Sequence, residues 1–178
     1  VERLGYKAGL CFHVGSQIED PDTYERALAS ADWVRNRLTF ELAGLDVGGG
    51  FPAAYQGVQL PPLQSYMDEI ESGLKALNLR RDCVTMCEPG RALVAAGMSL
   101  VTQVLLRKDD QVYINDGIWA SLSDSWTGKI TLPARLLPDP ARRKRAGSHE
   151  LAAFKVCGAT CDSVDILSRP FYLPQYVD

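Results

Sequence analysis

The chain has 178 residues and carries 19 Lys and Arg against 22 Asp and Glu, a formal net charge of -3. Hydrophobic residues make up 46% and charged residues 23%, close to the average of globular domains. This balance excludes a disordered chain, a collagen-like repeat and a coiled coil. The near-neutral charge provides no global field to recruit nucleic acid or an anionic membrane. The apolar runs are far shorter than the roughly 20 residues of a membrane span.

The five cysteines, at positions 11, 83, 87, 157 and 161, are an odd number, which argues against a closed disulfide framework. Three of them, Cys11, Cys83 and Cys87, lie in apolar runs, where a free cysteine behaves as a small hydrophobic side chain. The first residues do not have the pattern of a secretory leader. We therefore expect a reducing, cytoplasmic location.

The first half of the chain alternates short apolar runs with helical patterns. The apolar runs predict strands over 8–14, 42–47 and 83–87. Helices are predicted to begin at 20–23 and at 61–62, each followed by apolar residues at helical spacing. Short connections between these elements favour parallel pairing through right-handed crossovers.

The second half differs, and we place the domain boundary so that residues 1–97 and 98–178 form separate domains. Alternating apolar residues predict strands over 99–106, 111–115 and 154–157. A turn is expected at Asp109-Asp110, and the segment 133–147, rich in Pro, Arg and Lys, is expected to be a loop. Its basic run, 142–145, indicates a solvated loop rather than a nucleic-acid site. No comparable helical pattern occurs, so this half predicts an antiparallel sheet.

Three predicted strands of the first half end in unusual residues. These ends are His13-Val14-Gly15-Ser16, Gly48-Gly49-Gly50 and Glu88-Pro89-Gly90-Arg91. A single histidine, a glycine turn or a Glu–Arg pair each has an ordinary structural explanation. Three such ends in succession favour one shared site, because functional groups collect at the carboxyl ends of parallel strands.

These residue types suit a phosphate group. Successive glycines allow backbone N–H groups to approach an anion closely. Ser16 adds a hydroxyl donor, and Arg91 a fixed positive charge. The spacing of the glycines matches neither a dinucleotide-binding fingerprint nor a Walker loop. A phosphate on a small cofactor is therefore favoured over a nucleotide.

The order of the motifs resembles the pyridoxal-phosphate-dependent decarboxylases of the ornithine/lysine/diaminopimelate family. The resemblance adds two later motifs to the three strand ends: Asn115-Asp116-Gly117 and Gly158-Ala159-Thr160-Cys161-Asp162-Ser163-x-Asp165. It implies an α/β fold, namely part of a TIM-like (β/α)8 barrel of the alanine-racemase type followed by part of an antiparallel β domain. It also implies pyridoxal 5'-phosphate as cofactor.

The resemblance assigns roles to the residues of the first half. His13 would stack on the pyridine ring, and Glu88 would face the ring nitrogen, where a carboxylate favours the protonated ring. The phosphate would be held by Ser16, Gly48, Gly49, Gly50, Gly90 and Arg91.

In the second half the resemblance concerns the substrate. Cys161 would be the acid that returns a proton after carbon dioxide leaves. Asp162 would bind the distal ammonium of a basic amino acid, giving a diamine for polyamine synthesis. The diaminopimelate branch resembles Cys-Glu-Ser here, so Cys161-Asp162-Ser163 favours ornithine or lysine. In the family these residues reach the neighbouring subunit's site, which implies a head-to-tail homodimer with shared active sites.

The sequence departs from the family pattern in two places. None of its lysines lies in the family's Tyr-x-x-Lys-x-Asn setting, and Lys7 is expected at the opposite end of its strand from His13. We therefore expect an internal piece of a longer enzyme, inactive alone. Relatives acting on ornithine often carry a Tyr-Asp pair near 121–129, where this chain has Asp124 as a candidate ammonium contact. Ornithine is our first choice over lysine.

Three other interpretations stay open. The pairs Cys83/Cys87 and Cys157/Cys161 raise a metal site, but their spacing differs from that of structural zinc pairs, and we expect no metal. A decarboxylase-like regulatory protein without catalysis is the second, although the presence of all the motif residues argues against it. A diaminopimelate decarboxylase or racemase on the same barrel is the third.

Overall fold

The computed structural model describes residues 2–55, 58–128, 130–137 and 150–177. The chain divides into two compact units, Val1–Met98 (unit 1) and Ser99–Asp178 (unit 2). Within the described ranges, no helix is both long and apolar enough to span a membrane.

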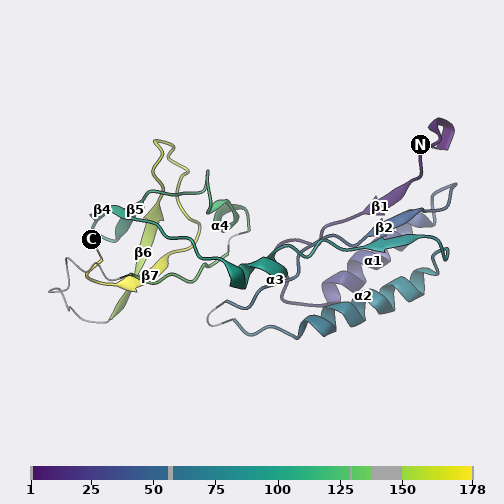
Figure 1. Cartoon of the computed structure of the whole chain (residues 1–178), viewed down its shortest axis with the longest axis horizontal. Helices are drawn as coiled ribbons and strands as arrows, with labels where there is room; N and C mark the ends of the chain where they lie inside the picture. Colours follow the sequence, from purple (N-terminus) through teal and green to yellow (C-terminus); the bar gives the residue numbers. More distant parts are fainter. Residues whose placement is uncertain (1, 56–57, 129, 138–149, 178) are drawn as a thin grey trace. The chain divides into compact units, whose positions relative to one another are not determined.

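Unit 1 is built on a three-stranded parallel sheet, ordered β1-β2-β3. Its strands are β1 (Gly9–Cys11), β2 (Gly44–Asp46) and β3 (Val84–Met86). The crossovers contain α1 (Asp22–Arg35) and α2 (Leu63–Leu77), which pack side by side next to the sheet (Figure 1). The predicted parallel β-α-β-α-β order is confirmed. The described residues form an open sheet.

The core of unit 1 lies between the helices and β2. Its fully buried side chains include Tyr24 and Leu28 from α1, Leu45 from β2 and Tyr66 from α2. The helices approach closely at Gly73, where an added Cβ would lie 2.5 Å from Leu28 Cδ1. The apolar spacing that predicted the two helices is thus the spacing of their buried faces.

The three strands are shorter than predicted, but backbone pairing continues past their ends. The Phe12 N–H donates to Asp46 O at 3.2 Å, and the Val47 N–H donates to Met86 O at 2.9 Å. Cys11 and Cys87 are exposed and Cys83 is half-buried, contrary to their interpretation as small hydrophobic packing residues. The reason is that β1 and β3 are the edges of the described sheet, and every residue of β3 is exposed.

Short helices occur at both ends of unit 1. A 3-10 turn, η1 (Glu2–Leu4), precedes β1, whereas α3 (Arg91–Val94) and η2 (Ala95–Gly97) follow β3. The sequence predicted Glu88–Arg91 as the end of a strand, but it predicted neither α3 nor η2. Arg91 is the first residue of α3, so this helix holds the backbone from which the Arg91 side chain projects.

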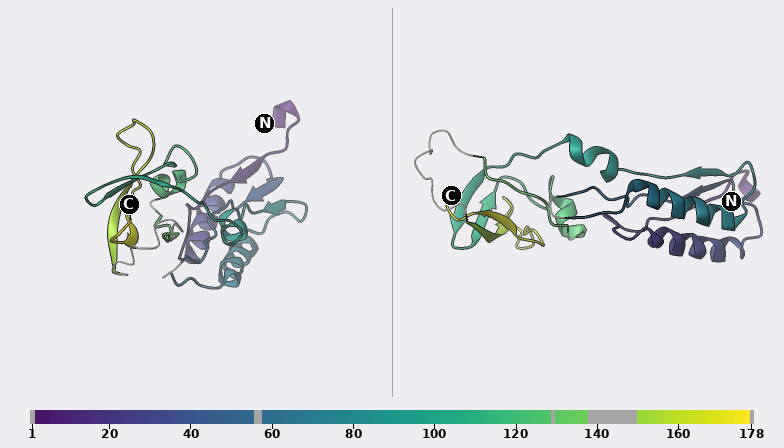
Figure 2. Two further views of the ribbon diagram at one scale, coloured as in Figure 1. Left: turned by 60° about the vertical axis from the view of Figure 1, so that its left-hand side comes forward. Right: turned by 90° about the horizontal axis from the view of Figure 1, so that it is seen from below.

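Unit 2 contains a four-stranded sheet, ordered β4-β5-β6-β7. Its part of the chain is coloured from teal-green to yellow in Figure 2. The strands are β4 (Val104–Lys108), β5 (Gln111–Ile114), β6 (Leu151–Cys157) and β7 (Phe171–Pro174), and α4 (Ser123–Thr127) is a short helix. The core is formed by Val112, Phe154, Val156, Leu173 and Val177, among others. The turn predicted at Asp109-Asp110 joins β4 to β5, with Asp109 at a φ of 55°.

The prediction of an antiparallel second domain is wrong for the central strand pair. β4–β5 and β6–β7 are antiparallel, but β5 and β6 are parallel, with Gln111 opposite Lys155 and Tyr113 opposite Cys157. A parallel pair needs a long connection, and the chain between β5 and β6 includes α4. The sequence also gave no indication of β7 or α4. Within the predicted loop, 133–137 carry no helix or strand, whereas 138–147, with the basic run, lie outside the described residues.

Candidate functional site

The loops that follow β1, β2 and β3 meet at the carboxyl end of the unit 1 sheet. The Gly49 N–H donates a 3.2 Å hydrogen bond to Nδ1 of His13. The Glu88 N–H donates to Gly48 O at 2.8 Å. His13, the glycine triplet and Glu88, singled out separately in the sequence, therefore lie at one place.

The glycine triplet is packed so closely that side chains cannot fit. Gly48 has a φ of 68°, and a Cβ added there would lie 2.0 Å from Phe12 O. Gly50 has a φ of 105°, and its added Cβ would lie 2.5 Å from Gly15 O. At Gly49 the added Cβ would lie 2.7 Å from Glu88 O. The triplet thus brings backbone against backbone between all three loops.

Positive charge enters this site through Arg91. Its Nη2 donates to Ser16 Oγ at 3.1 Å, and its Nη1 donates to Tyr55 Oη at 2.8 Å. Ser16 and Arg91, 75 positions apart in the chain, are therefore in direct contact. Tyr55 was missed by the sequence analysis, because it lies in a loop without a periodic pattern beyond the glycine motif.

His13 and Glu88 are both exposed, as is Ser16. Because Nδ1 of His13 accepts the hydrogen bond from Gly49, the proton of the neutral imidazole lies on Nε2. The exposed carboxylate of Glu88 belongs to a residue whose backbone is held by Gly48. Gly90 differs from the triplet: its φ is -73° and an added Cβ would meet nothing within 4 Å.

In unit 2 the predicted Cys-Asp motif forms an exposed turn tied to a buried carboxylate. Asp165 is only 2% exposed. Its Oδ2 accepts hydrogen bonds from Thr160 N–H (3.2 Å) and Thr160 Oγ1–H (2.6 Å), and its Oδ1 accepts one from Ile118 N–H (3.0 Å). Burial acts to raise the pKa of Asp165, but these hydrogen bonds outweigh it and lower the pKa below its ordinary value. The carboxylate is therefore held in its charged form.

Two glycines make room for this carboxylate. A Cβ added at Gly158 would lie 2.1 Å from Asp165 Oδ2, and one added at Gly117 would lie 2.3 Å from Oδ1. The Gly117-Ile118 segment and the Thr160–Asp162 turn are thus joined through Asp165. Asp165 belongs to the predicted motif, but its role could not be predicted, since nothing in the local pattern marks it as buried.

The proposed substrate residues of unit 2 occupy different positions. Asp162 is exposed, and its Oδ1 accepts a 3.0 Å hydrogen bond from Val164 N–H. Together with Tyr113, Gln111 and Thr160 it lines a depression of about 500 Å³. Cys161 is exposed beside it in the chain but is not part of this lining. Asp124 lies exposed on α4, also outside the lining.

No group of three or more His, Cys, Asp or Glu side chains in the described residues could hold a metal ion.

Comparison with known proteins assigns the chain to a family. Residues 6–95, about half of the chain, match the family described as "Pyridoxal-dependent decarboxylase, pyridoxal binding domain". The chain belongs to this family. The pyridoxal-binding domain contains all the strand-end residues of unit 1, from His13 to Arg91, whereas Cys161 and Asp162 lie beyond it. The resemblance inferred from the motifs is confirmed, and so is pyridoxal phosphate as the cofactor of the family.

Relatives extend the likeness to both units. The chain is 30% identical to a lysine/ornithine decarboxylase of Selenomonas ruminantium, over 94% of this chain and 42% of that protein. It is 28% identical to antizyme inhibitor 2 of Xenopus laevis, over 94% of this chain and 40% of that protein. Among solved structures it resembles the agmatine-bound arginine decarboxylase of Paramecium bursaria Chlorella virus, with a TM-score of 0.67 and 27% identity, covering 98% of this chain and 47% of that one. The chain spans about two fifths of the length of these curated relatives.

Proposed function

We propose that this chain is part of a pyridoxal-phosphate-dependent decarboxylase that removes the α-carboxylate of a basic amino acid and yields a diamine. The observation that supports this most is the meeting of three strand-end loops around the glycine triplet, beside the Ser16–Arg91 pair. A backbone cradle that side chains would fill, next to a guanidinium, fits the phosphate of a small cofactor.

In this proposal the residues of unit 1 hold the cofactor at two ends. Ser16, Arg91 and the glycines Gly48, Gly49, Gly50 and Gly90 surround the phosphate, and Tyr55 orients Arg91 through their 2.8 Å hydrogen bond. Glu88 faces the pyridine nitrogen, and its negative charge keeps a proton on that nitrogen. His13 covers one face of the ring. When bound, pyridoxal phosphate supplies the electron sink that decarboxylation requires.

Unit 2 supplies the acid and the substrate contact in the proposed reaction. Cys161 holds a proton on Sγ and delivers it to the substrate carbon that has lost carbon dioxide. Asp162 pairs with the distal ammonium, with Asp124 as a second candidate. The exposed carboxylate of Asp162, next to Cys161, favours a substrate with a basic side chain. Relatives named for lysine, ornithine and arginine favour the same substrate class. We place ornithine before lysine.

The remaining proposals rest on the family resemblance. Residues 1–97 would be part of a TIM-like barrel and 98–178 part of the β domain. The protein would form a head-to-tail homodimer with shared active sites. A cytoplasmic location, inferred from the cysteines, stays a prediction.

A second candidate function is that of a regulatory decarboxylase-like protein without catalysis. The similarity to antizyme inhibitor 2 favours it, since its 28% identity is close to the 30% of the enzyme relative. Cys161 and Asp162, both exposed in one turn, favour the enzyme.

Release of carbon dioxide from ornithine, lysine, arginine and diaminopimelate by the intact gene product distinguishes these functions. We expect the highest kcat/KM for ornithine, and Asp162→Asn is expected to lower it by about 30-fold or more, the loss typical of a desolvated charge pair. The control is Asp110→Asn, which alters an exposed aspartate in the β4–β5 turn and should leave kcat/KM unchanged.

The same assay tests whether activity needs the lysine of the family's Tyr-x-x-Lys-x-Asn setting, which is not among the lysines of these 178 residues. The polypeptide of these 178 residues alone is expected to release no carbon dioxide. An intact gene product inactive on all four amino acids would support the regulatory alternative, whereas activity of the 178-residue polypeptide would contradict the proposal that it is incomplete.

A further inference from the structure

Each of the three carbonyl groups of the glycine triplet accepts a hydrogen bond from a different segment of unit 1. Gly48 O accepts from Glu88 N–H at 2.8 Å, and Gly50 O accepts from Ile18 N–H at 3.0 Å. Gly49 O accepts from the hydroxyl of Tyr24, on α1, at 2.8 Å. The backbone of the triplet is therefore anchored on every carbonyl.

The N–H groups of the triplet are not equally occupied. The Gly48 N–H donates to Asp46 Oδ1 at 2.8 Å, and the Gly49 N–H donates to His13 Nδ1 at 3.2 Å. Within the described part of the chain, the Gly50 N–H has no hydrogen-bond acceptor. It is thus the one amide of the triplet that is ready to bind a ligand.

Tyr24 is itself firmly placed. Its side chain is completely buried, stacks on Phe51 with ring centroids 5.1 Å apart and meets the edge of Tyr66 at 6.3 Å. Burial raises the pKa of the Tyr24 hydroxyl far above its ordinary value, with a smaller contribution from Cys87. The hydroxyl therefore stays protonated and serves as a donor.

Gly49 O, which Tyr24 holds, and the Gly50 N–H belong to the same peptide group. In a trans peptide the C=O and the N–H point in opposite directions, and the described chain has no cis peptide. Tyr24 draws Gly49 O toward α1, so the Gly50 N–H points away from α1. We propose that Tyr24 is a positioning residue for the cofactor phosphate, holding the Gly49–Gly50 peptide so that the Gly50 N–H faces the anion. This inference rests on the proposed function.

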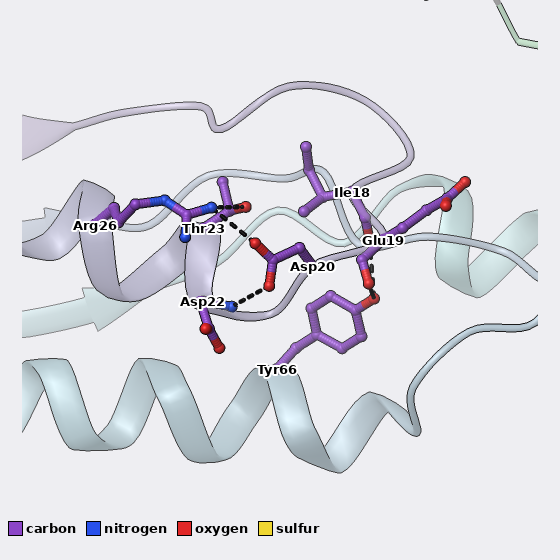
Figure 3. Close-up of polar contacts among 7 residues, drawn as sticks. All are labelled: Ile18, Glu19, Asp20, Asp22, Thr23, Arg26 and Tyr66. Atoms are coloured by element: carbon purple, nitrogen blue, oxygen red, sulfur yellow. Dashed lines mark hydrogen bonds and ion pairs between the residues drawn. The ribbon is translucent and has the colours of Figure 1, made fainter.

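Tyr66 provides a matched comparison. It is also completely buried, and its hydroxyl lies 3.0 Å from Ile18 O and 3.1 Å from Glu19 O (Figure 3). Its hydroxyl thus holds carbonyls of the loop after β1 but no peptide of the triplet. Removal of either hydroxyl deletes a buried hydrogen bond, yet only the Tyr24 hydroxyl bonds directly to the Gly49–Gly50 peptide.

The test compares Tyr24→Phe with Tyr66→Phe in the apo form of the intact gene product. Pyridoxal 5'-phosphate and pyridoxal, which lacks the phosphate, are titrated by equilibrium dialysis, and unfolding is measured in parallel. Tyr24→Phe is expected to weaken binding of pyridoxal phosphate by about three- to ten-fold, the value of one hydrogen bond. Binding of pyridoxal should not change. Tyr66→Phe should leave the ratio of the two affinities as in the wild type.

A second measurement does not depend on a variant that folds. In the wild-type protein labelled with ¹⁵N-glycine, pyridoxal phosphate should move the Gly50 amide resonance and pyridoxal should not. An unchanged Gly50 resonance, or equal losses for both ligands in Tyr24→Phe, would overturn the inference while leaving the proposed function in place. A wild-type protein that binds neither ligand would instead remove the proposed function and this inference with it.

Discussion

Gly48→Ala is expected to destabilise unit 1 by about 3 to 5 kcal/mol, the sum of a left-handed backbone and an overpacked contact. Gly48 has a φ of 68°, and the added Cβ would lie 2.0 Å from the carbonyl oxygen of Phe12. Both obstacles are backbone, so no side chain can rotate away. The loops after β1 and β2 must separate, which would also break the cradle beside His13 and weaken binding of pyridoxal phosphate.

Urea unfolding followed by circular dichroism measures this loss. The matched control is Gly97→Ala in η2, where an added Cβ would meet nothing within 4 Å. That variant should differ from the wild type by less than about 0.5 kcal/mol. Equal stability of Gly48→Ala and Gly97→Ala would show that the loops after β1 and β2 are not in contact as described.

Asp165→Asn is expected to cost unit 2 about 2 to 4 kcal/mol, because it replaces charge-assisted hydrogen bonds. Asp165 accepts three hydrogen bonds on two oxygens, from Thr160 and Ile118. An asparagine of the same shape must direct its NH₂ group at one of these donors. The turn that carries Cys161 should loosen, which thermal unfolding and hydrogen exchange of the Thr160 amide can detect.

The stability that the Asp165 carboxylate contributes to unit 2 depends on pH. The pKa of Asp165 is lowered in the folded protein, so its carboxylate contributes stability above its ordinary value of 3.8, and the contribution is lost as the pH falls through the lowered pKa. Asp165→Asn should therefore lose the most stability near neutral pH and progressively less below pH 3.8. The control is Asp110→Asn, an exposed aspartate of the β4–β5 turn. A loss for Asp165→Asn as small as that of the control at pH 7 would contradict the role given to this carboxylate.

The sequence predicted the parallel half of the fold well because its signals are local. Apolar stripes such as Tyr66, Ile70 and Leu77 fix a helix and its buried face together. The Gly48–Gly50 triplet likewise indicated a tight loop, since side chains are excluded there. Strand pairing in unit 2 is different: the parallel partners β5 and β6 are far apart in the chain, and no local pattern records their direction.

The residues of the candidate site also differ in whether the local sequence reveals them. His13, Ser16, Glu88 and Arg91 could be named from residue type and position after strands. Tyr24 and Tyr55 could not, because a tyrosine in an apolar stripe or loop does not indicate which carbonyl or guanidinium its hydroxyl will meet. Cys161 and Asp162 were found through the family resemblance, whereas the buried anchor of their turn, Asp165, depends on the contact with Ile118 across 47 positions.

The central claim is that the loops after β1, β2 and β3 surround a single pyridoxal phosphate. A crystal structure of the intact gene product with pyridoxal phosphate bound tests this most directly. The phosphate is expected against the Gly50 amide and the Arg91 guanidinium, with His13 over the ring and Glu88 facing its nitrogen. A cofactor bound elsewhere, or reversed so that Glu88 lies beside the phosphate, would contradict the account.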